Sequence, residues 1–431
     1  MMPDQTTAIW ILCLSFAVLL ILRFPVALTL VASSILTLWY LDIPLVVVGQ
    51  QMIQGITIYS LLAIPFFILT GQILGEGGLA NRIVNLANLF VGRIRGGLAL
   101  VNSVACMFFG NLSGSAVADA SAIGSVMIPL MKKKGYAADY CVGVTISSAI
   151  QGVVVPPSHN LVLYAIAAGG VSISGLFLAG IVPGIILLSS LMLTSYIIAV
   201  KKGYPKGDPV VKAQIPGILF HGLLSFTPAV IILGGIISGW ATATESGALA
   251  AVYSFLLAFL VYREASLKQM WPVLVRTFRT VLMVFFLIAA SQAFGWVMAY
   301  LHLPDLITKW FLSVSDQPWV ILLMINVLLL ILGAPMDMAP MILILTPVLL
   351  PVCKAIGMDP IHFGIVLIFN AGMGLLTPPV GTVLFVGCAI GKVSVDAGTR
   401  AMMPFFLAML VVLFMLTYIP ALSMWLPNMF K

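Results

Sequence analysis

The chain has very few charged residues for its length. Of its 431 residues, 8% are Asp, Glu, Lys or Arg, whereas a soluble globular domain carries roughly 25%. Such a chain cannot cover a water-facing surface, which excludes a soluble enzyme or nucleic-acid-binding domain. The hydrophobic share of 62% instead predicts a multi-pass protein of the lipid bilayer.

The residue patterns of common catalytic centres are also missing. The five cysteines are scattered through apolar segments without a CxxC spacing, and no HExxH or GxSxG sequence stands out. The glycines of 387–394 are too closely spaced for a phosphate-binding loop. We therefore expect no ATP hydrolysis, and the chain is predicted not to be an enzyme.

Long apolar segments broken by charged residues, Pro and Gly predict an all-α fold. Simple membrane helices are expected at 7–22, 25–41, 44–75, 172–200, 214–238, 243–262, 281–301 and 402–426. Two basic, amphipathic segments, 81–97 and 263–279, predict helices that lie in the membrane interface. The polar segment 201–216 is expected to link two halves of the chain.

Two apolar regions interrupted by Gly, Pro, Ser, Thr and Asp resemble each other. They span 98–171 and 319–398, and their Pro-Pro pairs at 156–157 and 378–379 lie 222 residues apart. Because proline removes a backbone donor and bends the preceding residue out of the helix, each pair predicts a broken helix. Broken helices at matching places in two repeats point to the binding site of a transporter.

The basic residues indicate how the chain crosses the membrane. We interpret 98–131 and 319–350 as re-entrant hairpins and place the N-terminus outside. Nearly all Lys and Arg residues then fall on the inner side, except Lys309, Lys354 and Lys431. This is the positive-inside pattern, so the net charge of +7 reflects topology rather than nucleic-acid binding. The two hairpins enter from opposite sides, which makes the repeats inverted.

Acidic side chains at bilayer depth are functional candidates, because each costs about 2.5–3.5 kcal/mol to insert. Asp119 and Asp337 are expected to occupy nearly equivalent positions, since each lies ten residues before a proline. A third acid, Glu245, is expected to bond locally or to a neighbouring helix. Carbonyl groups freed at a Pro-Pro break need a partner in the membrane, and Na⁺ prefers such oxygen ligands. Candidate Na⁺ ligands are Ser113, Ser115, Asp119 and the carbonyls of 152–155, including Gly152 and Val154, then Asp337, Thr377 and the carbonyls of 371–376.

Polar residues near the Pro-Pro pairs are candidates for substrate contacts. A helix that restarts at His159 would turn its N-terminal amide groups toward the site, where they favour an anion. A neutral His159 that only caps the helix is the alternative. The candidate substrate residues are Asn111, Gln151, Ser158, His159, Asn160 and Asn370. The residues interpreted as interface anchors rather than ligands are Arg93, Arg95, Arg276 and Arg279.

Several segments together resemble the large membrane subunit of TRAP (tripartite ATP-independent periplasmic) transporters. They include SGSAVADASAIGSVMIPLMKKKGY, ATATESGALAAVY and GLLTPPVGTVLFV, and the resemblance runs from about 55 to 405. It implies an elevator-type transporter of the bacterial inner membrane, coupled to two or more Na⁺ and without an organic cofactor. The Na⁺ sites that it implies involve Ser113, Asp119, Gly152, Asp337, Gly374 and Thr377.

The resemblance also implies partners and a substrate class. A periplasmic binding protein would deliver an organic acid, and a small membrane subunit would bind the scaffold; we expect the chain to be unfused to that subunit. Many family members have apolar residues at the positions of Gln151 and His159. The polar residues found here favour a hydroxyl-rich substrate such as sialic acid, with a C4-dicarboxylate or a sugar acid as the alternatives.

The resulting hypothesis divides the chain into a static scaffold and a mobile transport domain. The scaffold comprises 1–95 and 201–315, each with an interfacial helix and the second with the linker. The transport domain comprises 96–200 and 316–431, the latter including the C-terminal helix. Three alternatives stay open: a stand-alone Na⁺/carboxylate symporter, the membrane subunit of a Na⁺-pumping decarboxylase, and a channel.

Overall fold

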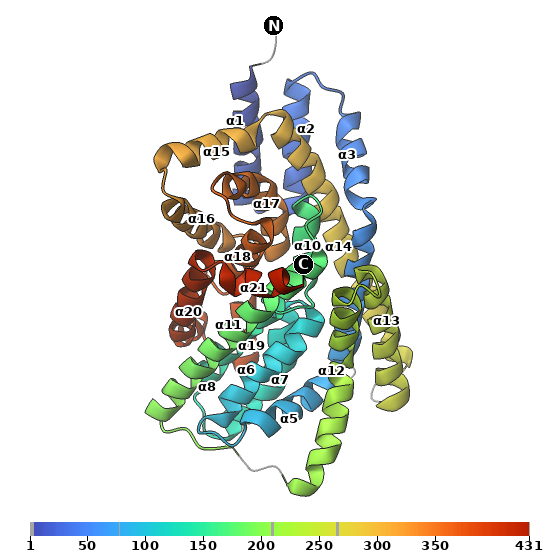
Figure 1. The fold of residues 1–431 in the computed structure, drawn as a ribbon, viewed down its shortest axis with the longest axis vertical. Coiled ribbons are helices and arrows are strands. Elements are labelled where there is room, and N and C mark those ends of the chain that lie inside the picture. Colours follow the sequence, from blue (N-terminus) through green and yellow to red (C-terminus); the bar gives the residue numbers. More distant parts are fainter. Residues whose placement is uncertain (1–3, 77, 208–210, 264–266, 431) are drawn as a thin grey trace.

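The computed structural model describes residues 4–76, 78–207, 211–263 and 267–430 (Figure 1). Within these ranges, seven helices are long and apolar enough to cross a membrane, and a helix pair bent by 50° makes an eighth. Large apolar side chains such as Trp39 and Met283 lie on the outside, 74% and 72% exposed, where lipid can cover them. The all-α, multi-pass class is therefore confirmed. The predictions for 208–210, 264–266 and Lys431 lie outside the described residues.

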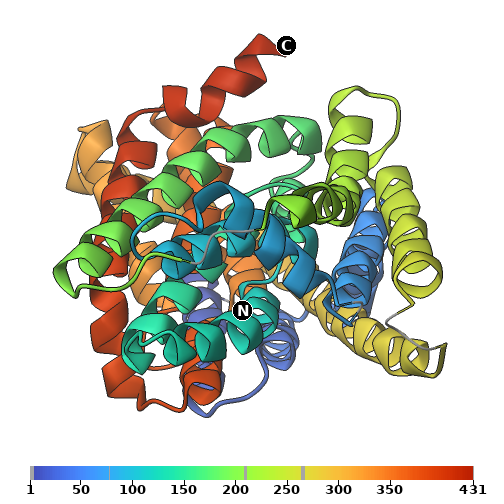
Figure 2. The ribbon, with the colours of Figure 1, turned by 90° about the horizontal axis from the view of Figure 1, so that it is seen from below.

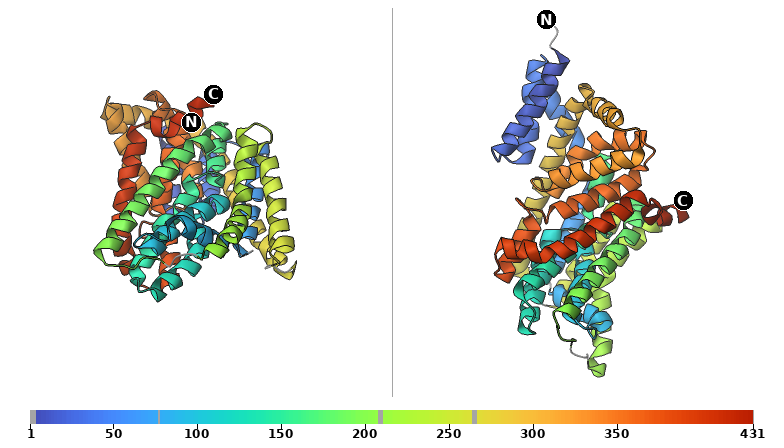
Figure 3. Two further views of the ribbon diagram at one scale, coloured as in Figure 1. Left: turned by 60° about the horizontal axis from the view of Figure 1, so that its bottom comes forward. Right: turned by 90° about the vertical axis from the view of Figure 1, so that its left-hand side faces the viewer.

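The same series of helices occurs twice along the chain: two arms of a hairpin, a broken helix, and a long helix. The first series is α6 (Gly97–Ser113), α7 (Ala116–Lys133), α8 (Ala138–Ala149), α9 (Gln151–Val154), α10 (His159–Ala167) and α11 (Ile173–Lys201). The second is α16 (Pro318–Gly333), α17 (Met338–Ala355), α18 (Pro360–Gly374), α19 (Thr382–Gly391) and α20 (Val395–Tyr418). The long helices α11 and α20 begin 222 residues apart and pack side by side (Figure 3).

The remaining helices lie before, between and after these two series. They are α1 (Gln5–Ile21), α2 (Val26–Tyr40), α3 (Val46–Ile56), α4 (Ala63–Glu76), α5 (Leu79–Val91), α12 (Ile215–Ile237), α13 (Ala243–Leu256), α14 (Leu267–Tyr300), α15 (Leu303–Val314) and α21 (Ala421–Met429). Helix α14 packs on α2, α3 and α4, and α13 packs on α4 and α12. Seen from below, α12, α13 and α14 lie at one side of the molecule and α20 at the opposite side (Figure 2).

Two predictions about helix continuity were wrong, in opposite senses. The segment expected as one helix at 44–75 breaks at residues 57–58, where Ile58 is extended, and α4 begins after a short 3₁₀ turn. The second predicted interfacial helix instead continues without interruption into the span expected at 281–301, as the 34-residue helix α14. Its basic N-terminal part packs against α3. The amphipathic pattern there thus belongs to the end of a long helix.

Three further helix boundaries differ from those expected. The first interfacial helix stops at Val91 rather than 97, because Gly96 adopts a left-handed φ of 72° that ends the turn before α6. Helix α15 was not predicted, although it precedes the second hairpin as α5 precedes the first. The helix expected at 402–426 ends at Tyr418, and Pro420 separates it from α21.

Candidate ion and substrate site

The tip of the first hairpin, residues 113–115, is built by the small polar residues that stand out in the sequence. Gly114 takes a left-handed φ of 62°, which glycine adopts without steric cost. Ser115 then caps α7, its Oγ accepting from the amide of Ala118 at 3.3 Å, while its own amide donates to Ser113 Oγ at 3.3 Å. The Ser and Gly residues therefore reverse the chain and satisfy its backbone groups.

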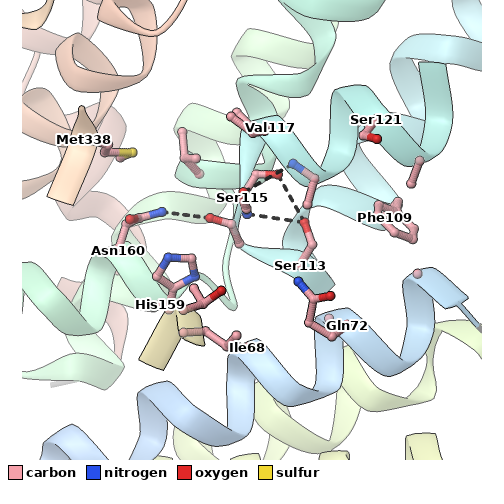
Figure 4. A pocket seen from close by; sticks show the side chains of 18 of the residues that line it. Ile68, Gln72, Phe109, Ser113, Ser115, Val117, Ser121, His159, Asn160 and Met338 are labelled. Atoms are coloured by element: carbon pink, nitrogen blue, oxygen red, sulfur yellow. Dashed lines mark hydrogen bonds between the residues drawn. The ribbon is translucent and has the colours of Figure 1, made fainter. Parts of the chain in front are cut away.

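The first break, residues 155–158, is tied to that tip. Val155 leaves the helix in an extended conformation, the Pro156-Pro157 bond is cis, and Ser158 caps the restarted helix α10. The side-chain amide of Asn160 donates to the carbonyl oxygen of Gly114 at 2.8 Å (Figure 4). Hairpin and broken helix thus meet through one direct hydrogen bond.

A glycine contact brings Asp119 to the break. A Cβ placed on Gly152 would lie 2.6 Å from Gly110 Cα, and one placed on Gly110 would lie 2.9 Å from Asp119 Oδ2. The second repeat has the same contact, since a Cβ on Gly374 would lie 2.7 Å from Gly333 Cα. Sequence reasoning missed Gly110 and Gly333. Their signal was the repeat itself, because each lies 222 or 223 residues from its counterpart.

Asp119 is fully buried, and neither of its carboxylate oxygens has a hydrogen-bond partner. Two further buried oxygens of the same hairpin and broken helix, Asn111 Oδ1 and Gln151 Oε1, are also without a partner. A buried charge is expensive unless another charge or a metal ion compensates it. The donor set, made of carboxylate, amide and nearby backbone oxygens, fits a small hard cation.

Asp337 occupies a different position from Asp119, so the expected equivalence of the two acids is wrong. Asp337 caps α17, where its Oδ1 accepts from the amide of Met338 at 2.9 Å, and its side chain is exposed. Its counterpart 222 residues earlier is Ser115, the cap of α7, and that of Asp119 is Met341. The matching spacing to a proline misled the comparison, because Pro129 corresponds to Pro351 rather than to Pro347.

A cavity of about 700 Å³ lies between the first hairpin tip and helices α4 and α14. In Figure 4, Ile68 and Gln72 of α4 face the hairpin, and His159 lies beside them. The candidate residues that line this cavity are Ser113, Ser115, His159, Asn160 and Asp337. Those that do not are Asn111, Asp119, Gln151, Gly152, Val154, Ser158, Asn370, Gly374 and Thr377.

Two candidate substrate residues serve packing instead. Gln151 is fully buried and donates to the carbonyl oxygens of Ser103 and Ser148, both at 3.1 Å. Asn370 is equally buried and donates to Asn326 Oδ1 at 2.8 Å. Each side chain joins the first arm of a hairpin to the broken helix of its repeat. Thr377, at the second break, donates to the carbonyl oxygen of Met373 at 3.1 Å.

The wall opposite the first hairpin carries charge that sequence reasoning misplaced. Arg276 of α14, interpreted as an interface anchor, pairs with Glu76 at the end of α4, and both line the cavity. Only the tertiary fold brings these residues together, since 200 positions separate them. Glu245 bonds locally, as expected, to the amide and hydroxyl of Thr242.

Comparisons with known proteins agree with this architecture. The C4-dicarboxylate TRAP transporter large permease protein DctM of Pseudomonas aeruginosa is 41% identical over 370 residues, 86% of each chain. The sialic acid TRAP transporter large permease protein SiaM of Vibrio cholerae is 38% identical over 382 residues, 89% of each chain. Among solved structures, the YdaH transporter of Alcanivorax borkumensis has the same fold, with a TM-score of 0.62 at 14% identity over 85% of this chain and 86% of that one.

These relatives are transport permeases rather than enzymes, and the apolar helices place the chain in the inner membrane as a multi-pass protein. The sequence profile of the tripartite ATP-independent periplasmic transporter, DctM component, matches residues 13–422. The chain therefore belongs to the DctM family, the large permease subunits of TRAP transporters.

Proposed function

We propose that this permease subunit couples the entry of Na⁺ to the uptake of an organic acid. The observation that carries the proposal is Asp119, a fully buried carboxylate whose two oxygens have no hydrogen-bond partner. Na⁺ at Asp119 would take further oxygens from the hairpin tip and the first break. A second Na⁺ is assigned to the second repeat, where Gly374 contacts Gly333 and Thr377 lies at the break.

The proposed mechanism is an elevator. The transport domain, 96–200 and 316–431, carries both hairpins and both breaks, and the scaffold, 1–95 and 201–315, carries α4 and α14. Na⁺ bound beside Gly152 would hold the hairpin tip against the break. The bond from Asn160 to Gly114 transmits that order to the cavity, because His159 and Ser113 line it. The loaded domain would then move across the membrane along α4 and α14.

The cavity favours a hydroxyl-rich acid such as sialic acid. Its volume of about 700 Å³ lies within the usual range for small-molecule sites, about 300–1,000 Å³. Hydroxyl and amide groups surround it, including Ser113, Ser121 and Asn160, whereas Arg276 is the one permanently cationic side chain among its described lining residues. A C4-dicarboxylate would bring two carboxylates to that single cation. Since relatives of similar identity carry names with either substrate, the choice rests on the lining.

The family is tripartite, so the permease works with a substrate-binding protein and, in most members, a small membrane subunit. We propose that this chain receives its acid from a periplasmic binding protein while the small subunit contacts the scaffold. Uptake that needs no binding protein would instead favour the stand-alone symporter.

Uptake by proteoliposomes tests the ion assignment. The permease, reconstituted with its small subunit and binding protein, should accumulate N-acetylneuraminate only with an inward Na⁺ gradient. Asp119→Asn and Asp119→Ala should abolish that dependence, and Asp337→Ala should weaken it. Asp305→Asn, which alters an exposed acid paired with His302, is the control and should transport like the wild type. If Asp119→Ala and Asp337→Ala both kept Na⁺-dependent uptake, the ion site would be misassigned.

A further inference from the structure

The cavity has a charged wall on the side away from the hairpin. Glu76 is the last residue of α4, and Arg276 lies on α14, with its Nη2 bonded to Glu76 Oε1. Both side chains are 47% exposed, and both line the cavity together with Ser113. The pair therefore faces the space through which a substrate would pass.

An acidic substrate needs a cation in this space. The described lining already contains two acids, Glu76 and Asp337, which would repel a carboxylate. Arg276 is the permanently cationic side chain that opposes them. Its planar guanidinium presents paired donors that match the two oxygens of a carboxylate.

The bond between Arg276 and Glu76 is easily exchanged. Ion pairs that are this exposed contribute little to folding, because water solvates both partners. A second carboxylate can therefore replace that of Glu76 without a large loss. Glu76 would hold the guanidinium while the cavity contains no acid and would return to it after the acid leaves.

We propose that Arg276 is a carboxylate-binding residue of the scaffold wall and that Glu76 is its built-in competitor. This inference rests on the proposed transport of an organic acid and deepens it. Because Arg276 lies on the opposite wall from the moving hairpin, the contact exists only while the transport domain faces this cavity. The basic-residue pattern places Arg276 on the inner side, so the pair acts on release to, and loading from, the cytoplasm.

Two single substitutions should act in opposite directions. Arg276→Gln removes the cation, whereas Glu76→Gln removes its competitor and leaves the guanidinium available. Efflux from proteoliposomes preloaded with N-acetylneuraminate, or with succinate, gives a KM at the inner face. Arg276→Gln should raise this KM about tenfold, as expected for a lost charge-assisted hydrogen bond. Glu76→Gln should lower it about threefold.

Arg279→Gln is the matched control, since Arg279 lies on the same helix, is exposed, and does not line the cavity. Its KM should equal that of the wild type. A purely structural pair would make Arg276→Gln and Glu76→Gln impair efflux alike and destabilise the protein alike; that result, or an unchanged KM in Arg276→Gln, would overturn the inference. A wild type that transports neither acid would overturn the proposed function itself, and the inference with it. A lower KM in Glu76→Gln cannot come from misfolding.

Discussion

At the scale of single residues, two glycines without chemical groups of their own shape the ion site. Gly110 and Gly152 let the backbone of the hairpin reach the backbone of the broken helix, and this contact leaves Asp119 buried beside the break. The sequence could single out Asp119, because a carboxylate in an apolar segment is conspicuous. It could not single out the glycines, since the segment is rich in small residues and only the fold shows which two touch.

Gly152→Ala should disable the ion site without unfolding the protein. Its Cβ would lie 2.6 Å from Gly110 Cα, a backbone atom that cannot move alone. Overpacking of this kind costs about 1–3 kcal/mol, so the hairpin should withdraw and the Na⁺ concentration for half-maximal uptake should rise at least about tenfold. Gly295→Ala is the control, because nothing lies within 4 Å of its added Cβ. Equal Na⁺ dependence in the two variants would refute the role given to this contact.

At the scale of elements, hairpins and broken helices were predictable, whereas continuity and short helices were not. Pro-Pro pairs and Ser/Gly-rich turns act locally, so the chain at 113–115 and 155–158 folds as its residues indicate. The break at Ile58 and the unbroken α14 depend instead on packing against other helices. Helix α15 has 12 residues of mixed polarity, too few to stand out from the apolar spans beside it.

The cap of α13 separates a structural acid from a functional one. Thr242 and Glu245 form a capping box in which each side chain satisfies the other's backbone amide. Glu245→Ala should therefore cost about 1 kcal/mol of stability, seen as a lower midpoint of thermal unfolding. Na⁺-dependent uptake per folded molecule should stay at the wild-type value, and Glu245→Gln, which keeps the acceptor, should restore the midpoint. Loss of the Na⁺ dependence in Glu245→Ala would show that this acid belongs to the coupling machinery.

At the scale of the whole molecule, the two repeats share their order but differ in chemistry. The first places a buried acid beside its glycine contact, while the second has Met341 at that position and an exposed acid, Asp337, at its hairpin cap. The two proposed Na⁺ sites therefore differ in charge and in access to water. Duplication of the backbone gave two similar frames, and the side chains within them have diverged.

An elevator requires the first hairpin to slide along α4, and a covalent bond between them should stop it. A Cβ on Gly71 would lie 3.4 Å from that of Ser113, a few tenths of an ångström short of the usual disulfide separation. In a double variant with Gly71→Cys and Ser113→Cys, oxidation should abolish uptake and reduction should restore it. The ratio of oxidised to reduced rates is the measurement, so any effect of either cysteine alone cancels.

The same bond within the scaffold gives the matched control. A Cβ on Gly235 would lie 3.5 Å from that of Ser246, and both residues belong to helices that the elevator leaves in place, α12 and α13. Oxidation of Gly235→Cys with Ser246→Cys should leave uptake unchanged. A channel, which needs no such sliding, should keep conducting with the hairpin bonded to α4. Full uptake in the oxidised 71–113 protein would therefore rule out the elevator, whereas inhibition confined to that pair would locate the moving boundary between α4 and the hairpin.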